Sequence, residues 1–258
     1  MRQNLALAKW RRGEPAIGGW LQLPTTHSAE LMSHAGFDYL CVDLQHGMVE
    51  PVDLARMLPA ISTTDTTPLV RVVQNDPGQI MRALDLGAMG VIVPLVNTRA
   101  QAEAAIAACR YPPGGMRSFG PIRAALYGGR GYATEANDQI ACIVMIETAE
   151  ALEHLESIVS TPGLDAVYIG PADLALSLGL PAQGDTEDPL HLKTVERIRT
   201  VCRNYKVPCG IHTAGLDYTR RRLAMGFDFA TLGGDVGFMM RMANAELAAA
   251  KEAAAARS

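Results

Sequence analysis

The stretch "YLCVDLQHGMVE" at residues 39–50 joins an unbroken apolar run to an abrupt cluster of polar side chains. Residues 39–44 read as a strand buried on both faces, because a half-exposed strand would alternate apolar and polar residues. Asp43, Gln45 and His46 stand where this strand ends. Burying an acid, an amide and an imidazole together is costly unless each has a polar partner. The stretch therefore predicts a strand of a parallel sheet that ends at a polar site.

Similar apolar runs recur along the whole chain, with helical patterns between them. The predicted strands are residues 16–23, 39–44, 68–73, 90–96, 140–147, 166–170, 208–213 and 229–234. The predicted helices are residues 28–35, 51–60, 77–86, 98–108, 149–159, 188–205 and 215–225. This repeated alternation predicts a (β/α)8 TIM barrel formed by a single domain, residues 1–258. An open doubly wound sheet is the alternative, but no GxGxxG follows the first run.

Composition narrows the class of protein. The 258 residues are 48% hydrophobic and 19% charged, with a formal net charge of −4. We expect no nucleic-acid partner, because no basic stripe interleaves with aromatic residues, and no membrane partner, because no apolar run is long enough. The five cysteines are odd in number and form no CxxC motif. Reduced thiols in a cytoplasmic protein are therefore expected.

Two segments depart from the alternation. Residues 109–139 are rich in glycine and arginine, and a long insertion of this kind in a compact domain is usually functional or mobile. The final residues 245–258, "AELAAAKEAAAARS", form a strong helix pattern with a thin apolar stripe. This helix is expected either to contact a partner subunit or to fray.

The carboxyl ends of barrel strands gather on one face, so their polar residues should converge. Glu147 follows a wholly apolar run, and Asp173 lies in "GPADL" after the next predicted strand. Helix capping could explain Glu147, and a helix first turn could explain Asp173. Together, two carboxylates without nearby cysteine form a hard oxygen site that suits Mg²⁺ or Mn²⁺. We therefore predict a divalent-metal site.

Cations and imidazoles at the strand ends complete the predicted site. Arg71 interrupts an apolar strand, which indicates an ion pair with Asp43 or Glu147, a clamp for a carboxylate or oxyanion, or both. His46 is either a structural histidine or a base whose other nitrogen is held by a carboxylate, and His212 is a weaker candidate. None of the four lysines ends a predicted strand, which disfavours Schiff-base chemistry.

The motifs resemble the metal-dependent (class II) pyruvate aldolases of the 4-hydroxy-2-oxoheptanedioate and 2-dehydro-3-deoxyglucarate aldolase type. The matching stretches are "GGWLQLPTTHSAELMSHAGFDYLCVDLQHG", "VRVVQNDPGQIMRALDLGAMGVIVPLV", "RYPPGGMRS", "ANDQIACIVMIET" and "GLDAVYIGPADLALSLG". The resemblance implies a (β/α)8 barrel assembled as a homohexamer, a trimer of dimers, with the C-terminal helix exchanged between paired subunits. It also implies a divalent cofactor, Mg²⁺ or Mn²⁺, for which Co²⁺ can substitute.

The resemblance further implies roles for individual residues. Glu147 and Asp173 match the metal ligands, and Arg71 matches the arginine beside the enolate oxygen. The remaining matches are His46 and Asp85 as a proton-transfer pair, the backbone of Gly170, Pro171 and Ala172 as the carboxylate pocket, Trp20 at the mouth, and Asp43 as an acid behind the site. Gln45 stands where the family commonly has an acid, and His212 where an aliphatic residue is common, so these departures bear on recognition of the aldehyde.

These observations predict an aldolase that cleaves a 4-hydroxy-2-keto acid to pyruvate, or a related 2-keto acid, plus an aldehyde through a stabilised enolate. Three alternatives stay open. An acyl-CoA lyase of the citramalyl- or malyl-CoA type could use the same constellation, with arginines of residues 110–130 binding the CoA phosphates. An oxaloacetate decarboxylase would pass through the same enolate. A non-catalytic sugar-acid binding protein would not need His46, Asp85 and two metal ligands together.

Overall fold

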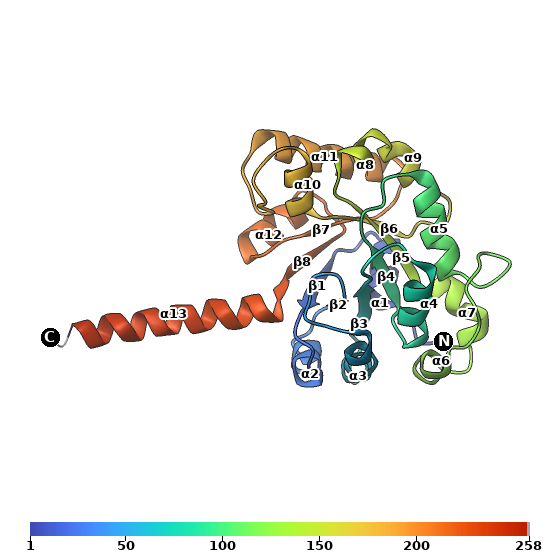
Figure 1. The fold of residues 1–258 in the computed structure, drawn as a ribbon, viewed down its shortest axis with the longest axis horizontal. Coiled ribbons are helices and arrows are strands. Elements are labelled where there is room, and N and C mark those ends of the chain that lie inside the picture. The colour runs from blue at the N-terminus through green and yellow to red at the C-terminus, as the bar shows by residue number, and fades with distance from the viewer. Residues whose placement is uncertain (257–258) are drawn as a thin grey trace.

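A computed structural model describes residues 1–256 as a closed barrel of eight parallel strands in sequence order (Figure 1). The strands are β1 (Ala16–Leu21), β2 (Tyr39–Asp43), β3 (Thr67–Arg71), β4 (Gly90–Val93), β5 (Ala141–Ile146), β6 (Ala166–Ile169), β7 (Cys209–His212) and β8 (Phe229–Gly234). Each lies within one residue of a predicted apolar run or inside it, and β1 closes the barrel against β8. The predicted TIM barrel is confirmed.

The helices surround the barrel and differ from prediction in several places. They are α1 (Leu5–Arg11), α2 (Thr26–His34), α3 (Pro51–Ile61), α4 (Pro77–Asp85), α5 (Arg99–Cys109), α6 (Ile122–Gly128), α7 (Tyr132–Gln139), α8 (Ala149–Glu153), α9 (Leu155–Val159), α10 (Pro171–Ser177), α11 (Pro189–Asn204), α12 (Leu216–Ala224) and α13 (Asp235–Ala255). The segment 149–159 is two helices, broken at His154. Helices α1, α6 and α7 were not predicted, because their short apolar spacing resembles loop or core sequence. Helix α10 was expected only as a possible first turn at Asp173, and α13 starts ten residues before the predicted pattern.

A column of aromatic rings fills the barrel interior from floor to mouth. Trp10 packs on Phe229 with ring centroids 4.4 Å apart, Phe229 stacks on Tyr168 at 5.7 Å, and Tyr168 stacks on Trp20 at 5.7 Å. A Cβ at Gly210 would come within 2.3 Å of the Phe229 ring, so this glycine makes room for it. The column gives the mouth a rigid base, because packed rings have few alternative rotamers.

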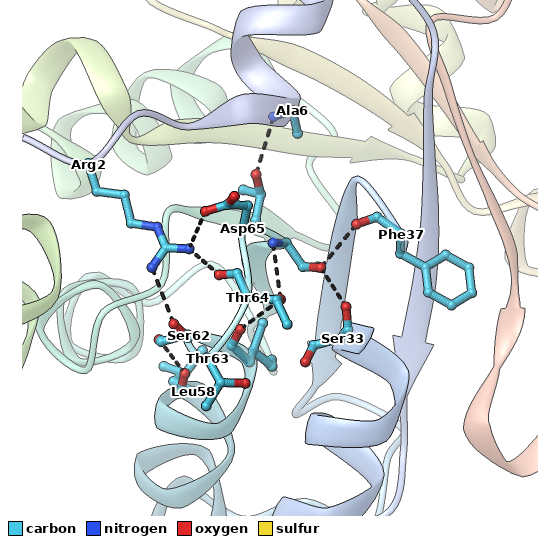
Figure 2. Close-up of polar contacts among 12 residues, drawn as sticks. Arg2, Ala6, Ser33, Phe37, Leu58, Ser62, Thr63, Thr64 and Asp65 are labelled. Atoms are coloured by element: carbon cyan, nitrogen blue, oxygen red, sulfur yellow. Dashed lines mark hydrogen bonds and ion pairs between the residues drawn. The ribbon is translucent and has the colours of Figure 1, made fainter. Parts of the chain in front are cut away.

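The N-terminal segment closes the barrel floor, meaning the end where the strands begin. Helix α1 inserts Leu7 and Trp10 into the interior cluster, and its Ala6 N–H donates to the Thr67 hydroxyl at 3.2 Å. Arg2 donates to the carbonyl of Ser62 at 3.3 Å and to that of Thr64, as Figure 2 shows. These contacts leave the opposite end as the open mouth of the barrel.

The insertion at residues 109–139 lies at the floor and not at the mouth. Helix α5 runs down the barrel, so the segment that follows it must begin at the floor. Arg110 donates to the Ile140 carbonyl and pairs with Asp165 at 2.5 Å, just ahead of β5 and β6. Arg123 donates to the Leu86 carbonyl at 3.0 Å, just ahead of β4. These arginines therefore do not line the mouth, where the acyl-CoA alternative would need them.

Helix α13 projects away from the barrel (Figure 1). It exposes the apolar side chains of Met239, Met240, Met242 and Leu247. Residues 257–258, the end of the predicted terminal helix, lie outside the described residues. Across the part of the chain that the structure describes, no helix combines the length and apolar character needed to cross a membrane.

Candidate active site

Arg71 and Asp43 are partners in the register between β3 and β2, so their side chains project side by side into the mouth. Arg71 Nε donates to Asp43 Oδ1 at 2.8 Å, and Nη2 donates to Oδ2 at 2.6 Å. This is the bidentate geometry for which a guanidinium is suited. No described residue accepts a hydrogen bond from Nη1, so that nitrogen is available to a ligand.

Asp43 has further partners that keep it ionised. It accepts from Trp20 Nε1 at 3.1 Å and from the backbone N–H groups of Gln45 and His46 at 3.1 and 3.3 Å. Burial raises the pKa of Asp43, but the hydrogen bonds and charge of Arg71, together with Trp20 and His46, outweigh it and lower the pKa overall. Asp43, at the strand end in "YLCVDLQHG", therefore has a partner for each carboxylate oxygen, and it orients Arg71 and fixes the start of the loop that carries His46.

His212 ends β7 and packs against the aromatic column. Its ring meets Trp20 edge-on with centroids 4.9 Å apart, and its Nδ1 lies 3.1 Å from the Tyr168 hydroxyl. Burial lowers the pKa of His212 to about 4; the charge of Arg71 lowers it further, while Asp43 opposes the shift. His212 is therefore neutral near pH 7 and adds no cation to the mouth.

Glu147 directly follows β5 and is 2% exposed. Its Oε1 accepts from the Leu95 N–H at 2.8 Å, and Leu95 adopts a left-handed φ of 54° that is unusual for a non-glycine residue. Its Oε2 is buried and has no hydrogen-bond partner among the described residues. Burial raises the pKa of Glu147 to about 7, with Asp173 adding to the rise and the Leu95 N–H and Arg71 opposing it. Such an orphaned carboxylate oxygen requires a proton or a cation.

Asp173 stands in the first turn of α10, and its exposed side chain lines a cavity at the mouth of the barrel. Its charge acts on Glu147, so the two carboxylates face a shared space. Within residues 1–256 no group of three or more histidine, cysteine or acidic side chains could enclose a metal ion. A divalent ion fits this pair as a hard cation held by two carboxylates, with its other positions open to water and substrate oxygens.

The turn at Gly170–Ala172 joins β6 to α10 beside Glu147. A Cβ at Gly170 would come within 2.2 Å of Glu147 Oε2, so only glycine fits there without displacing the carboxylate. His191, a fully buried residue of α11, places Nε2 at 2.9 Å from the Pro171 carbonyl. The turn is therefore held from both sides. No pattern distinguishes His191 in the sequence, because its position resembles any other on the apolar face of its helix.

These groups surround one cavity of about 340 Å³ at the mouth of the barrel. Its lining includes the predicted residues Trp20, His46, Arg71, Gly170, Pro171, Ala172, Asp173 and His212. It also includes Gln22, Met145, Tyr168, Gly184, Asp185, Thr213 and Ala214. Tyr168 escaped prediction because a mid-strand aromatic looks like core. Asp185 lies in an aperiodic loop, where the spacing of residues carries no signal.

Two predicted residues lie elsewhere. The Gln45 side chain lines a neighbouring cleft between α3 and α4, and only its backbone N–H serves the mouth, through Asp43. Asp85 ends α4 at the barrel floor, where Arg117 Nη2 donates to its Oδ1 at 2.9 Å. His46 lies in the loop after β2 at the mouth. Within one chain, Asp85 and His46 are thus at opposite ends of the barrel.

Comparison with known proteins agrees with this architecture. Residues 16–241 match the family model described as HpcH/HpaI aldolase/citrate lyase. A hydroxypyruvate/pyruvate aldolase of Rhizorhabdus wittichii is 40% identical over 94% of this chain and 96% of its own. The 4-hydroxy-2-oxo-heptane-1,7-dioate aldolase of Escherichia coli is 36% identical over 94% of this chain and 93% of its own.

A solved structure gives the same result for the fold. A HpcH/HpaI aldolase/citrate lyase family protein from Burkholderia cenocepacia superposes with a TM-score of 0.90 at 33% identity, covering 96% of this chain and 100% of its own. The resemblance read from the sequence motifs is confirmed. The chain belongs to the HpcH/HpaI aldolase/citrate lyase family and is a carbon–carbon lyase.

Proposed function

We propose that this enzyme is a metal-dependent aldolase that cleaves a 4-hydroxy-2-keto acid to pyruvate, or a related 2-keto acid, and an aldehyde. The observation that carries the proposal is the buried, unpartnered Oε2 of Glu147, which lies directly behind Gly170 in the wall of the cavity that Asp173 and Arg71 line. A buried carboxylate with a raised pKa beside a second carboxylate is costly unless a cation binds there. Family membership supports the same reaction.

Glu147 and Asp173 would hold the divalent ion, which we propose to be Mg²⁺ or Mn²⁺, with Co²⁺ as a substitute. When bound, the ion would polarise the keto group of the substrate and stabilise negative charge on its oxygen. Two oxygen ligands with no thiolate favour these hard ions over softer ones.

The protein's own groups would then divide the work. Arg71 offers Nη1 to the oxygen that becomes negative in the enolate, and Asp43 keeps the guanidinium in that orientation. The turn at Gly170–Ala172 would receive the substrate carboxylate beside Glu147. His46, exposed and lining the cavity, would move the proton between the substrate and water. Trp20 and His212 form an apolar wall that excludes water from the reacting carbon.

Asp85 would assist His46 from a neighbouring subunit. Within one chain the two lie at opposite ends of the barrel, so the proton-transfer pair implied by the family resemblance requires a second copy. Arg117 and its neighbour Tyr132 hold Asp85 in place, since Arg117 Nη2 lies 2.9 Å from Asp85 and 2.8 Å from the Tyr132 hydroxyl. We therefore propose a homohexamer built as a trimer of dimers. The projecting α13, with its exposed methionines, would be exchanged between paired subunits.

A cytoplasmic location completes the proposal. The five cysteines are free and buried, which suits a compartment where thiols stay reduced.

A panel of 4-hydroxy-2-keto acids, cleaved in the presence of Mn²⁺ or Mg²⁺, tests the function. Pyruvate release should disappear after thorough chelation with EDTA and return when metal is added. Full turnover by the chelated enzyme would contradict the proposal, and so would trapping of a pyruvate adduct by borohydride. Oxaloacetate and citramalyl-CoA belong in the panel, because a clear preference for either would move the assignment to decarboxylase or acyl-CoA lyase.

A further inference from the structure

A loop after α10 forms one wall of the active-site cavity, and two contacts hold it there. A Cβ on Gly184 would lie 3.1 Å from Pro171 Cγ, so the loop packs directly against the Gly170–Ala172 turn. Asp185 Oδ2 accepts from the Ala214 N–H at 3.1 Å, which ties the loop to the end of β7. The half-buried carboxylate of Asp185 is therefore fixed beside the cavity.

Asp185 stands apart from the carboxylates that would hold the metal. Arg71 ends β3 and Glu147 follows β5, whereas the Ala214 N–H anchors Asp185 beside the end of β7, and β6 lies between β5 and β7 in the barrel. The cavity thus has two ends. One end is lined by Arg71 and Asp173, with Glu147 behind Gly170, and is where the keto acid would react; the other is lined by Asp185 and Ala214 beyond the Gly170–Ala172 turn, and is where the aldehyde portion of the substrate would extend.

The second end offers a hydrogen-bond acceptor and no free donor from its immediate neighbours. The Thr213 hydroxyl donates to the Thr231 carbonyl at 2.6 Å and also contacts the Thr219 hydroxyl. The Ala214 N–H is already taken by Asp185. A ligand with O–H groups can donate to the remaining oxygen of Asp185, whereas a carboxylate or sulfonate cannot.

Within one chain, the cavity lining also offers no second arginine or lysine for another anionic group. Arg71 is the one arginine or lysine in its lining, and both oxygens of Asp43 already engage it. His212 is kept neutral near pH 7 by burial, which lowers its pKa to about 4. The Escherichia coli relative is named for a heptanedioate, whose second carboxylate would find no further arginine or lysine in this lining.

We propose that Asp185 selects the acceptor, so that this enzyme joins the keto acid to neutral, hydroxylated aldehydes and discriminates against aldehydes that carry an anionic group. This inference rests on the proposed aldolase function. Asp185 accepts hydrogen bonds from the hydroxyls of the aldehyde and repels a second negative charge. In the cleavage direction, the substrate is then a polyhydroxylated 2-keto acid with a single carboxylate.

The test compares aldehydes of similar size in the synthesis direction, using Mn²⁺-loaded enzyme and pyruvate. Glycolaldehyde carries a hydroxyl, propionaldehyde lacks it, and glyoxylate and succinic semialdehyde carry a charge. Wild-type kcat/KM should rank glycolaldehyde first and the anionic aldehydes at least about tenfold lower, the size of one uncompensated charge near the ligand. Asp185→Asn should raise the ratio of anionic to neutral aldehyde by about tenfold.

Glu187→Gln is the matched control. Glu187 lies on the same loop, pairs with Arg221 at 2.5 Å and does not line the cavity, so its variant should keep the wild-type ratio. A uniform loss with every aldehyde in Asp185→Asn would mean that Asp185 only supports the loop, and would overturn the proposal. Equal use of neutral and anionic aldehydes by the wild type would also overturn it. Pyruvate methyl exchange in D₂O, with no aldehyde present, separates the two levels: without exchange the aldolase function itself fails, whereas exchange without discrimination refutes the acceptor assignment alone.

Discussion

Two buried arginine–aspartate pairs lie at opposite ends of the barrel and differ in what else they contact. At the mouth, Arg71 lines the cavity and binds Asp43 through Nε and Nη2, and no described residue accepts from its Nη1. At the floor, Arg110 binds Asp165 and also donates to the carbonyls of Ile140 and Gly163. The floor pair is thus surrounded by backbone partners, whereas in the mouth pair no described residue accepts a hydrogen bond from Arg71 Nη1.

The two aspartates also respond differently to burial. Burial raises the pKa of each, but at Asp43 the bidentate Arg71 and two further side-chain and backbone donors bring the pKa below its usual value. At Asp165 the charge of Arg110 and the Cys142 N–H do not fully offset burial, and the pKa stays raised. An arginine–aspartate pair is thus enclosed by backbone partners at the floor, while at the mouth it holds a guanidinium at the cavity where we propose that the reaction takes place. The difference follows from position, because in a (β/α)8 barrel the carboxyl ends of the strands carry the site and the amino ends form the packed floor.

The proposed contact between Asp85 at the floor of one subunit and His46 at the mouth of another leads to the strongest predicted loss of activity. His46→Ala and Asp85→Asn should each slow cleavage by about 10²–10⁴-fold, the usual contribution of a proton relay. Subunits of the two variants, mixed by unfolding and refolding together, should regain a measurable part of wild-type activity, because some sites then combine an intact His46 with an intact Asp85. Failure of the mixed oligomers to exceed either variant alone would place Asp85 outside the relay.

Arg71→Ala comes next and probes the mouth pair. It should lower kcat by about 10²–10³-fold, because a donor to the developing oxyanion is lost. Arg71→Lys keeps a charge beside Asp43 and should fold normally, but it lacks the planar fork and should recover only part of the rate. Steady-state kinetics on variants with native circular dichroism decide the matter. A folded Arg71→Ala enzyme with near-normal kcat would remove Arg71 from the mechanism.

The matched change at the floor should have the opposite outcome. Arg110→Ala leaves Asp165 buried without its partner and should lower the free energy of unfolding by about 3 kcal/mol, measured by urea denaturation. The kcat of the folded fraction should change by less than about twofold, because Arg110 does not line the cavity. A large drop in kcat with unchanged stability would invalidate the distinction between the two ends.

Much of this arrangement could be predicted from the chain, and the exceptions have physical reasons. Arg71 and Glu147 can be predicted as site residues for two reasons. A charge buried in an apolar strand or at its end is costly without a partner, and the carboxyl ends of barrel strands meet on one face. Asp185 was missed because its loop has no periodicity. The arginines of residues 110–130 suggest a phosphate site by sequence alone. They lie at the floor, however, because the segment follows a helix that runs from the mouth of the barrel to its floor. Asp85 could be assigned only through the family resemblance, because the role we propose for it depends on a neighbouring subunit.

The smallest expected effect concerns pH and the mouth. The folded-state pKa of His212 is lowered to about 4, so the unfolded chain binds its proton more readily. Stability from this residue is complete above pH 6.5 and falls as the pH drops toward 4, by about 2 kcal/mol between pH 6.5 and 5. Urea denaturation across this range should show the slope, and His212→Gln should reduce it. An unchanged slope in that variant would show that His212 titrates normally.

Exchange of the pyruvate methyl protons in D₂O reports enolate formation without any aldehyde. It therefore measures by itself whether a metal ion at the barrel mouth stabilises the enolate of the keto acid. Proton NMR of pyruvate with Mg²⁺-loaded enzyme should show the methyl signal decaying at a rate proportional to enzyme concentration. Removal of the metal, or Glu147→Gln, should stop the decay, and added metal should restore it only in the wild type. Exchange that continues at the wild-type rate in Glu147→Gln, or in enzyme stripped of metal, would contradict the account of the mouth as a cation-stabilised enolate site.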